Sequence, residues 1–442
     1  MPAVNKICGK EDARIYSRKT TERRRRIMKR KKGFLTIQVV MLVALSFLLG
    51  TSEFIVVGIL PEISEGFNIS LTAAGAIVSV FAFAYAVGTP FCAASAGKFN
   101  RFRFMMVCVL IFAAANLLCG LTSMYLIFGA ARIVIAVISG TLVAVSMTFA
   151  GDVAAPENMS KVVAGIFSGF SIASVFGVPI ATAVTRFLNW RAAFFLIAAA
   201  SLAVTAVLYK TLPRTGGTEA HSVIRQFVLL RDRKIILGGL CVFFGAAGTY
   251  TVYTYLTPIF ETELHIPGNL ISFALLLFGV AALISNLYSG RLAGNGGMKR
   301  MPGIYVVHTL CLLCMPLATR NVATGLVAIF LLGVLIYLVN SPSQMLFLNT
   351  ASEEYPSCVN LAASFNSVFF NLGIAAGSFL GGLVVDHIGL RYVGAAGAVP
   401  AALAGMCAFL LAGILRRRES GKSEKEMRPG AGNRGMRNGI AG

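Results

Sequence analysis

Charged residues are scarce in this 442-residue sequence, and they are almost absent from its long apolar runs. Asp, Glu, Lys and Arg make up only 13% of the chain, whereas soluble domains carry about 25%. Of the 39 basic and 18 acidic residues, only Glu53 and Arg132 lie well inside an apolar run and not at its edge. A charge at bilayer depth costs roughly 2.5–3.5 kcal/mol on insertion scales, so it persists mainly where it is paired or used. These two residues are therefore the first candidates for a functional site.

The sequence also lacks the motifs of several enzyme classes. It contains no H-E-x-x-H, no G-x-S-x-G and no paired aspartates in an apolar run, which argues against a membrane-embedded enzyme. The letters GKS at 421–423 lack the upstream glycine of a P-loop, which argues against an ATP-driven pump. One C-x-x-C, Cys311 and Cys314, has no second pair, so two small core residues are favoured over a metal or redox site. The sequence predicts no cofactor and no metal.

Apolar residues, 57% of the chain, gather in twelve runs that are long enough to cross a bilayer. Such continuous runs predict an all-α membrane protein, since a β-barrel would show weak alternation over ten residues instead. The first run is too long for a signal peptide and has no A-x-A cleavage pattern. The runs lie near residues 34–59, 71–96, 104–122, 124–148, 162–185, 190–209, 235–258, 268–289, 302–319, 322–346, 361–385 and 392–415.

A polar stretch separates the runs into two sets of six, which predicts two six-helix bundles. It contains Pro213, Gly216, Gly217 and six basic residues, and it is typical of a linker. The segment that begins at Met28 resembles an ordinary protein start, so residues 1–27 are a candidate N-terminal extension. The predicted organisation is a basic tail (1–33), a first bundle (34–209), a linker (210–234), a second bundle (235–415) and a second basic tail (416–442).

The net charge of +21 is concentrated at the two ends of the chain. Residues 1–32 hold thirteen basic residues and residues 416–442 hold eight. With the N-terminus inside, cytoplasmic segments hold 34 Lys and Arg residues and external loops hold four. This bias predicts that both termini are cytoplasmic, in the inner membrane of a bacterium. Lipid-binding or RNA-binding tails are the disfavoured alternative, and no nucleic-acid partner is predicted.

The two halves resemble each other at a nearly constant offset. Gly50-Thr51 matches Gly248-Thr249, 198 positions further on, and the loop 95–103 matches 291–300. The glycine-rich fifth run around Gly177 matches the eleventh around Gly377. Glu53 is then aligned with Thr251, so only the first half keeps the acid. An internal repeat predicts a substrate site between the halves near the bilayer midplane.

Four segments carry a resemblance to the major facilitator superfamily, over nearly all of residues 34–415. They are GTSEFIVVGILPEI at 50–63, the loop ASAGKFNRFR at 94–103, Arg132 with Gly140 eight positions on, and the fifth run at 165–184. The likeness is greatest to the 12-span drug:proton antiporter branch, whose relatives export drugs, sugars or purine bases and nucleosides. The resemblance implies alternating access between the bundles, with spans one, four, seven and ten lining a central cavity.

The same resemblance assigns gating and packing residues. Gly97, Lys98 and Arg101 fall in the loop motif, and Gly165, Gly169, Gly177 and Pro179 fall in the fifth span. Two departures from the family pattern stand out. Gly97 and Gly294 occupy loop positions where the pattern has aspartate, which puts the implied outward-facing latch in doubt. Ala181 stands where a second glycine is common, which still allows helices to approach closely.

Glu53 and Arg132 are expected at matched depth. Each lies six to eight residues from the outer end of its span, which is roughly 9–12 Å at 1.5 Å per residue. One interpretation is a protonatable carboxylate tuned by a nearby cation, with Glu53 coupling export to proton entry. The alternative is a static buried ion pair that fixes helix packing.

The second half offers candidate substrate-binding groups. Tyr250 and Tyr253 in span seven suit a flat, partly polar ligand, or they belong to an interfacial aromatic belt. Asn340 and Gln344 in span ten are candidate hydrogen-bonding groups for substrate, or they bond neighbouring helices. Three further polar residues are best interpreted as forming bonds between helices: His308, Asn366 and Asn371. Asp152 and Lys161, which flank a loop, are interpreted as solvated charges.

The sequence thus predicts a secondary active exporter of a small amphipathic molecule. Proton antiport with alternating access is the leading mechanism. The alternative is a dedicated permease for purine bases, nucleosides or small sugars, with or without proton coupling. The expected partners are a small-molecule substrate, protons and membrane lipid, and the expected state is a monomer.

Overall fold

The computed structural model describes residues 36–95, 99–153, 159–214, 227–294, 296–355 and 359–426. These residues form helices and connecting turns, with no β-strand in the described ranges. Within them, twelve helices are long and apolar enough to cross a membrane, which confirms the predicted all-α fold. The predicted basic tail at 1–33 lies outside the described residues.

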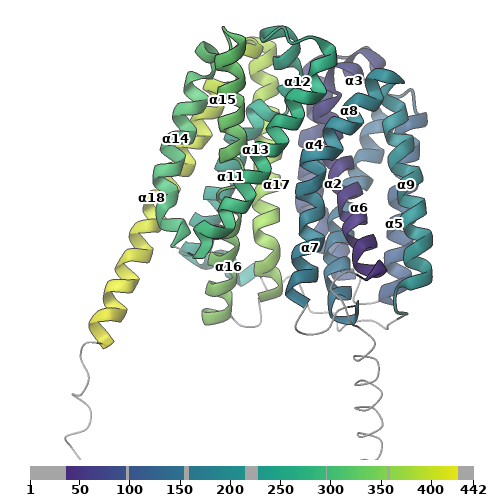
Figure 1. Ribbon diagram of the computed structural model, residues 1–442. Coiled ribbons are helices and arrows are strands. Elements are labelled where there is room, and N and C mark those ends of the chain that lie inside the picture. Colours follow the sequence, from purple (N-terminus) through teal and green to yellow (C-terminus); the bar gives the residue numbers. More distant parts are fainter. Residues whose placement is uncertain are drawn as a thin grey trace, which may run out of the picture.

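The helices form two bundles that stand side by side (Figure 1). The first bundle contains α2 (Ile37–Gly58), α3 (Leu60–Phe67), α4 (Leu71–Ser95), α5 (Arg101–Leu121), α6 (Tyr125–Val153), α7 (Met159–Ile172), η3 (Ala173–Gly177), α8 (Val178–Phe187) and α9 (Trp190–Thr211). The second contains η4 (Phe227–Arg231), α11 (Arg233–Tyr253), α12 (Leu256–Pro258), η5 (Ile259–Glu263), α13 (Gly268–Gly294), α14 (Gly297–Ala318), α15 (Val322–Leu335), α16 (Asn340–Glu354), α17 (Val359–His387), η7 (Leu390–Tyr392) and α18 (Val393–Glu426). The bundles meet where α4 packs on α17 and where α13 packs on η3 and α8.

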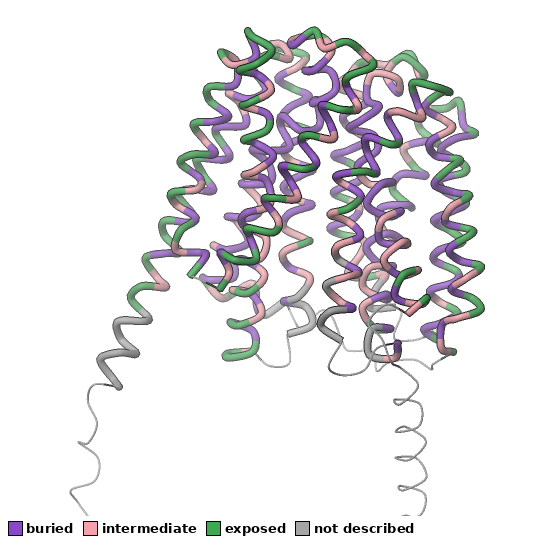
Figure 2. Tube along the Cα trace, viewed as in Figure 1, coloured by how far each residue is buried: buried purple, intermediate pink, exposed green. Residues whose placement is uncertain are grey.

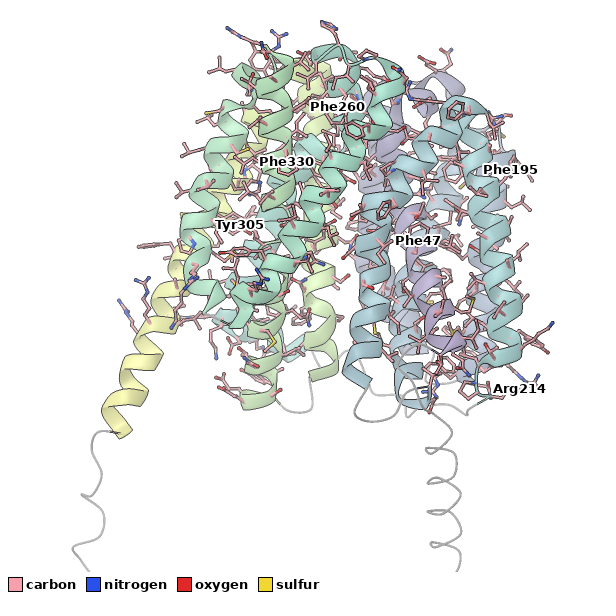
Figure 3. All side chains as sticks on the ribbon, viewed as in Figure 1. Phe47, Phe195, Arg214, Phe260, Tyr305 and Phe330 are labelled. Carbon is pink, nitrogen blue, oxygen red and sulfur yellow. The ribbon has the colours of Figure 1, made fainter. Side chains whose placement is uncertain are left out.

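The described chain begins and ends on the same side of the molecule (Figure 1). We call this side, which holds Thr36 and Glu426, the tail end, and the opposite side the loop end. The last helix, α18, continues past residue 415, where the predicted span stops. The outer surface is apolar: Phe195 and Phe330, on opposite bundles, are more than one-third exposed (Figure 3). Buried residues gather instead along the inner sides of the helices (Figure 2). An apolar exterior of this kind suits lipid.

Three spans are interrupted near a proline, whereas the sequence predicted continuous runs. Span one breaks at Ile59 before Pro61, span seven at Thr254 before Pro258, and span ten at 336–339 before Pro342. Proline has no N–H, so the carbonyl four residues earlier loses its helical donor. Span five has a similar irregularity, because the π-helical turn η3 directly precedes α8, whose second residue is Pro179. The apolar run predicted near 322–346 belongs to one candidate span, Val322–Glu354, which contains a non-helical turn at 336–339.

Close helix packing at glycines occurs in both bundles. A Cβ on Gly169 would meet the Val43 carbonyl oxygen, and one on Gly177 would meet the Thr51 hydroxyl. The corresponding contacts in the second bundle are Gly373 against the Phe243 carbonyl and Gly381 against the Thr251 carbonyl.

Gly377 is packed equally closely, because a Cβ there would meet the Ala247 carbonyl oxygen. Such contacts recur every four residues along α17 and do not define a single register between the two bundles. The alignment of Glu53 with Thr251 therefore stays a prediction.

Polar contacts join the bundles at the loop end. The Thr257 hydroxyl donates to the Val57 carbonyl at 2.8 Å, and both residues are fully buried. Arg186 forms an ion pair with Glu261 at 2.7 Å. The Thr72 hydroxyl donates to Asp386. These contacts hold the two bundles together at this end of the molecule.

Candidate functional site

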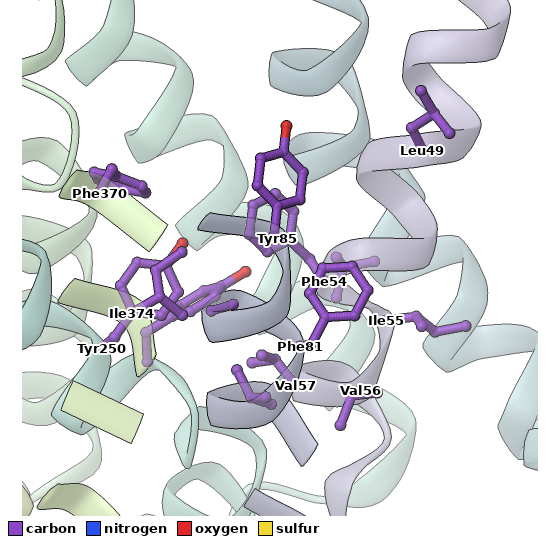
Figure 4. Packing of buried hydrophobic residues seen from close by; sticks show 14 of the residues in the cluster. Leu49, Phe54, Ile55, Val56, Val57, Phe81, Tyr85, Tyr250, Phe370 and Ile374 are labelled. Atoms are coloured by element: carbon purple, nitrogen blue, oxygen red, sulfur yellow. The ribbon is translucent and has the colours of Figure 1, made fainter. Parts of the chain in front are cut away.

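Glu53 lies between the two bundles, at the edge of a small cavity. It sits in α2, just over one turn before the helix ends at Gly58, and its side chain is half-buried. The cavity measures about 10 Å³, close to the smallest volume that holds one water molecule. Both bundles line it: Glu53, Phe54, Val57, Val78, Phe81 and Ala82 from the first, and Tyr250 and Ile374 from the second. Figure 4 shows Phe54, Phe81 and Tyr85 facing Tyr250 and Ile374.

Four tyrosines lie in the neighbourhood of Glu53. Each is close enough to interact electrostatically with it: Tyr85, Tyr250, Tyr253 and Tyr337. The rings of Tyr250 and Tyr253 have centroids 5.1 Å apart, and Tyr250 also contacts the Phe370 ring at 5.8 Å. The Tyr250 hydroxyl faces that of Tyr337 without a hydrogen bond of good geometry. The site therefore combines aromatic faces with hydroxyl groups and one carboxylate.

Arg132 approaches Glu53 but does not bind its carboxylate. The guanidinium is fully buried and donates from Nη1 to the Ser52 carbonyl at 2.5 Å and from Nη2 to the Glu53 carbonyl at 3.0 Å. It also lies 4.2 Å from the centre of the Phe81 ring. Arg132 thus holds the backbone of α2, and the direct ion pair that we considered from the sequence is absent between these two residues.

The Glu53 carboxylate has no hydrogen bond and no ion pair within the described part of the chain. A second contact fixes the same turn of α2 from behind. The Ser52 hydroxyl donates to Asn116 Oδ1 at 2.9 Å, and Asn116 Nδ2 donates to the Phe112 carbonyl at 2.9 Å. The sequence analysis missed this network, although Asn116 is a polar residue inside an apolar run.

The predicted substrate groups of span ten lie elsewhere. Asn340 begins α16, and its side-chain oxygen is buried without a hydrogen bond. Gln344 is half-buried one turn further along the same helix. Neither residue lines the Glu53 cavity, whereas Tyr250 does. Tyr253 packs against Phe54 of the first bundle, with ring centroids 6.4 Å apart. Tyr85, Tyr337 and Phe370 belong to the site but were not predicted.

The predicted gating residues are described only in part. Gly97 and Lys98 lie outside the described residues. Arg101 pairs with Asp152 and donates to the Thr148 carbonyl at 3.0 Å, so Asp152 is not simply a solvated charge. Gly165 accepts a hydrogen bond from Ser168 at its carbonyl, and the Lys161 side chain lies outside the described residues.

Two of the remaining polar residues bond to neighbouring helices, as the sequence favoured. His308 Nε2 lies 3.1 Å from the Thr249 hydroxyl. Asn366 Oδ1 accepts a hydrogen bond from the Ser343 hydroxyl at 2.6 Å. Asn371 instead bonds a carbonyl of its own helix, that of Ser367. Cys311 donates weakly to the Ala328 carbonyl. The described ranges hold no group of three or more potential metal ligands.

Comparison with known proteins places this architecture in a family. The family model of the Major Facilitator Superfamily matches residues 42–360. An uncharacterized MFS-type transporter, YbcL of Bacillus subtilis, is 30% identical over 85% of this chain and 96% of its own length. The inner membrane transport protein YdhP of Escherichia coli is 28% identical over 83% of this chain and 94% of its own length.

Solved structures agree on the fold. A bacterial homologue of the human lysosomal transporter Spinster, in an inward-facing and unoccupied conformation, aligns with a TM-score of 0.69. The alignment covers 86% of this chain and 97% of that chain at 14% identity, which shows the fold alone. The chain therefore belongs to the major facilitator superfamily. It is a multi-pass membrane transporter and not an enzyme.

Proposed function

We propose that this transporter exports a small amphipathic molecule in exchange for protons, and that Glu53 carries the proton. The observation that supports this role is the unpaired Glu53 carboxylate at the cavity between the bundles. A carboxyl group without an ion-pair partner gains and loses a proton without first breaking a salt bridge. Arg132, bound to the adjacent carbonyls, places a fixed positive charge near this carboxyl group.

The aromatic side chains of the site support a flat substrate. Tyr250, Tyr253 and Phe370 offer ring faces for stacking, and the tyrosine hydroxyls offer hydrogen bonds at the edges. We place the chain in the drug:proton antiporter branch because its first-span and fifth-span motifs resemble that branch.

The proposed export direction requires the tail end to face the cytoplasm. The excess of Lys and Arg in the segments at the tail end favours a cytoplasmic tail end. The contacts of Thr257, Arg186 and Thr72 then close the external side, so that the site would be reached from the cytoplasm. Opening the loop end while closing the tail end would release substrate outside and admit a proton to Glu53.

The second candidate is a dedicated permease for purine bases, nucleosides or small sugars. One observation favours it: the cavity is lined by a single carboxylate among apolar and aromatic side chains. Recognition of varied cationic drugs would be served better by several carboxylates. Such a permease would carry flux that ignores a proton gradient.

Transport into inverted membrane vesicles with an acidic lumen tests both candidates. We would assay ethidium, adenosine and xylose with the wild type, with Glu53→Gln and with Glu65→Gln as the control, since Glu65 is exposed at the loop end. Antiport predicts accumulation of one compound that depends on the pH gradient and is lost in Glu53→Gln. Counterflow, which needs no net proton movement, should persist in that variant. Gradient-driven accumulation retained by Glu53→Gln would exclude Glu53 as the proton carrier.

A further inference from the structure

Span ten is interrupted at the depth of the candidate site, and buried serines of span eight complete its backbone hydrogen bonding. Pro342 has no N–H, so the Leu338 carbonyl lacks its helical donor. The Ser289 hydroxyl, which is fully buried, supplies that donor at 3.1 Å. A carbonyl left without a donor would be strongly unfavourable here, because no bulk water reaches the centre of a bilayer.

Two more hydrogen bonds from the same helix face hold the interrupted segment. The Tyr337 N–H donates to the Ser285 hydroxyl at 2.9 Å, and the Ser341 N–H donates to the Ser289 hydroxyl at 2.9 Å. A hydroxyl can donate one hydrogen bond and accept two, so Ser289 serves both sides of the break. Ser285 and Ser289 are four residues apart and therefore lie on one face of α13.

The break carries one residue of the site. The Tyr337 ring contacts the Phe370 ring at a tilt of 34°, with centroids 5.8 Å apart, and Tyr337 is close enough to Glu53 to interact with its charge. Tyr85, Tyr250 and Tyr253 all lie within regular helices, whereas Tyr337 lies on the interrupted backbone. Its position therefore depends on the two serines and not on a helical hydrogen-bond ladder.

We propose that the break in span ten is part of the substrate site, in which Tyr337 binds substrate and Ser285 and Ser289 are positioning residues. The proposal rests on the proposed function, since it takes the Glu53 cavity as the substrate site. The Tyr250 hydroxyl lies beside that of Tyr337 and makes no hydrogen bond of good geometry within the described residues. A flat molecule with a hydrogen-bonding group at its edge would bond to these two hydroxyls once the cavity of about 10 Å³ widens to admit it.

Backbone amide exchange, measured by mass spectrometry on the detergent-solubilised full chain, tests the positioning role without any substrate. Each lost hydrogen bond should speed exchange of residues 336–343 roughly two- to tenfold. We expect this for Ser285→Ala and Ser289→Ala, whereas the threonine variants, which keep the hydroxyl, should restore slow exchange. Ser201→Ala is the matched control, because that buried hydroxyl bonds only within its own helix α9.

Pro342→Ala provides a second test that does not remove a serine. The new N–H can bond the Leu338 carbonyl, so exchange should slow and the effect of Ser289→Ala should shrink in the double variant. Equal exchange of residues 336–343 in the wild type and both alanine variants, or a Ser289→Ala effect unchanged by Pro342→Ala, would overturn the proposal.

The binding role is tested by the vesicle assay with ethidium and adenosine. Tyr337→Phe and Ser285→Ala should both raise KM while leaving the maximal rate nearly unchanged, and their combination should be no worse than either alone. Additive effects, or a lowered maximal rate with unchanged KM, would contradict the binding role. If no flux follows the pH gradient, the proposed function fails, but the exchange experiment still decides the role of the serines.

Discussion

The hydrogen bond from Thr257 to Val57 is the sharpest test of how the two bundles close at the loop end. Pro61 cannot donate to the Val57 carbonyl, so this carbonyl depends on a hydroxyl from the other bundle. Thr257→Val keeps the shape of the side chain and removes the donor. Leaving a buried carbonyl unpaired should destabilise the closed loop end by about 1–3 kcal/mol. That corresponds to a roughly 5- to 150-fold shift toward the open form.

Double electron–electron resonance, which measures distances between two spin labels, can detect this shift. Spin labels would be placed at Leu188 and Leu270, which are 72% and 49% exposed at the loop ends of opposite bundles, in a background without the nine native cysteines. Thr257→Val should increase the population of longer distances. Thr262→Val is the control, because that hydroxyl bonds the Pro258 carbonyl of its own segment at 2.8 Å. An unchanged distance distribution in Thr257→Val would refute the reasoning.

Three further predictions concern local packing and charge. Ser52→Ala removes the bond to the third span and should lower stability by about 1 kcal/mol, seen as a lower melting temperature in detergent. Gly177→Ala should destabilise by about 1–3 kcal/mol through overpacking against Thr51, and Thr51→Ala should relieve the clash; no rescue would mean that the contact is not the cause. Burial raises the pKa of Glu62, which lies outside the spans, and the nearby Glu261 carboxylate adds to the effect. As pH rises, Glu62 therefore loses its proton in the unfolded state before it does so in the folded state. Above the pKa of the unfolded state, this difference lowers the stability of the folded protein. Glu62→Gln should accordingly raise the melting temperature more at pH 8 than at pH 5. Equal increases at the two pH values would contradict this assignment.

The span pattern was predictable because each run of about twenty apolar residues has few alternatives to a membrane helix. The depth of Glu53 and Arg132 followed from counting residues along two spans. Their actual bonding did not follow, because the sequence gives no side-chain direction. Arg132 reaches the Ser52 and Glu53 carbonyls, which every residue possesses, and so no residue type signals this contact.

The breaks in the spans were partly readable. Pro61, Pro258 and Pro342 each mark a carbonyl that needs an outside donor, and a proline-interrupted span is a known sign of a binding site in transporters. The donors could not be predicted, because Thr257 and Ser289 are ordinary small polar residues in apolar spans. Their role arises only from helix packing across about 200 and 49 positions of the sequence, respectively.

The sequence by itself determined the helical membrane fold, the twelve spans and the two isolated charges, since hydrophobic length and the unfavourable burial of charge are local properties. Tertiary structure decided which side chains surround Glu53. An aromatic residue in an apolar span looks the same in the sequence whether it faces lipid or a site, and only packing distinguishes Tyr85 and Tyr337 from exposed residues such as Tyr209 and Tyr288.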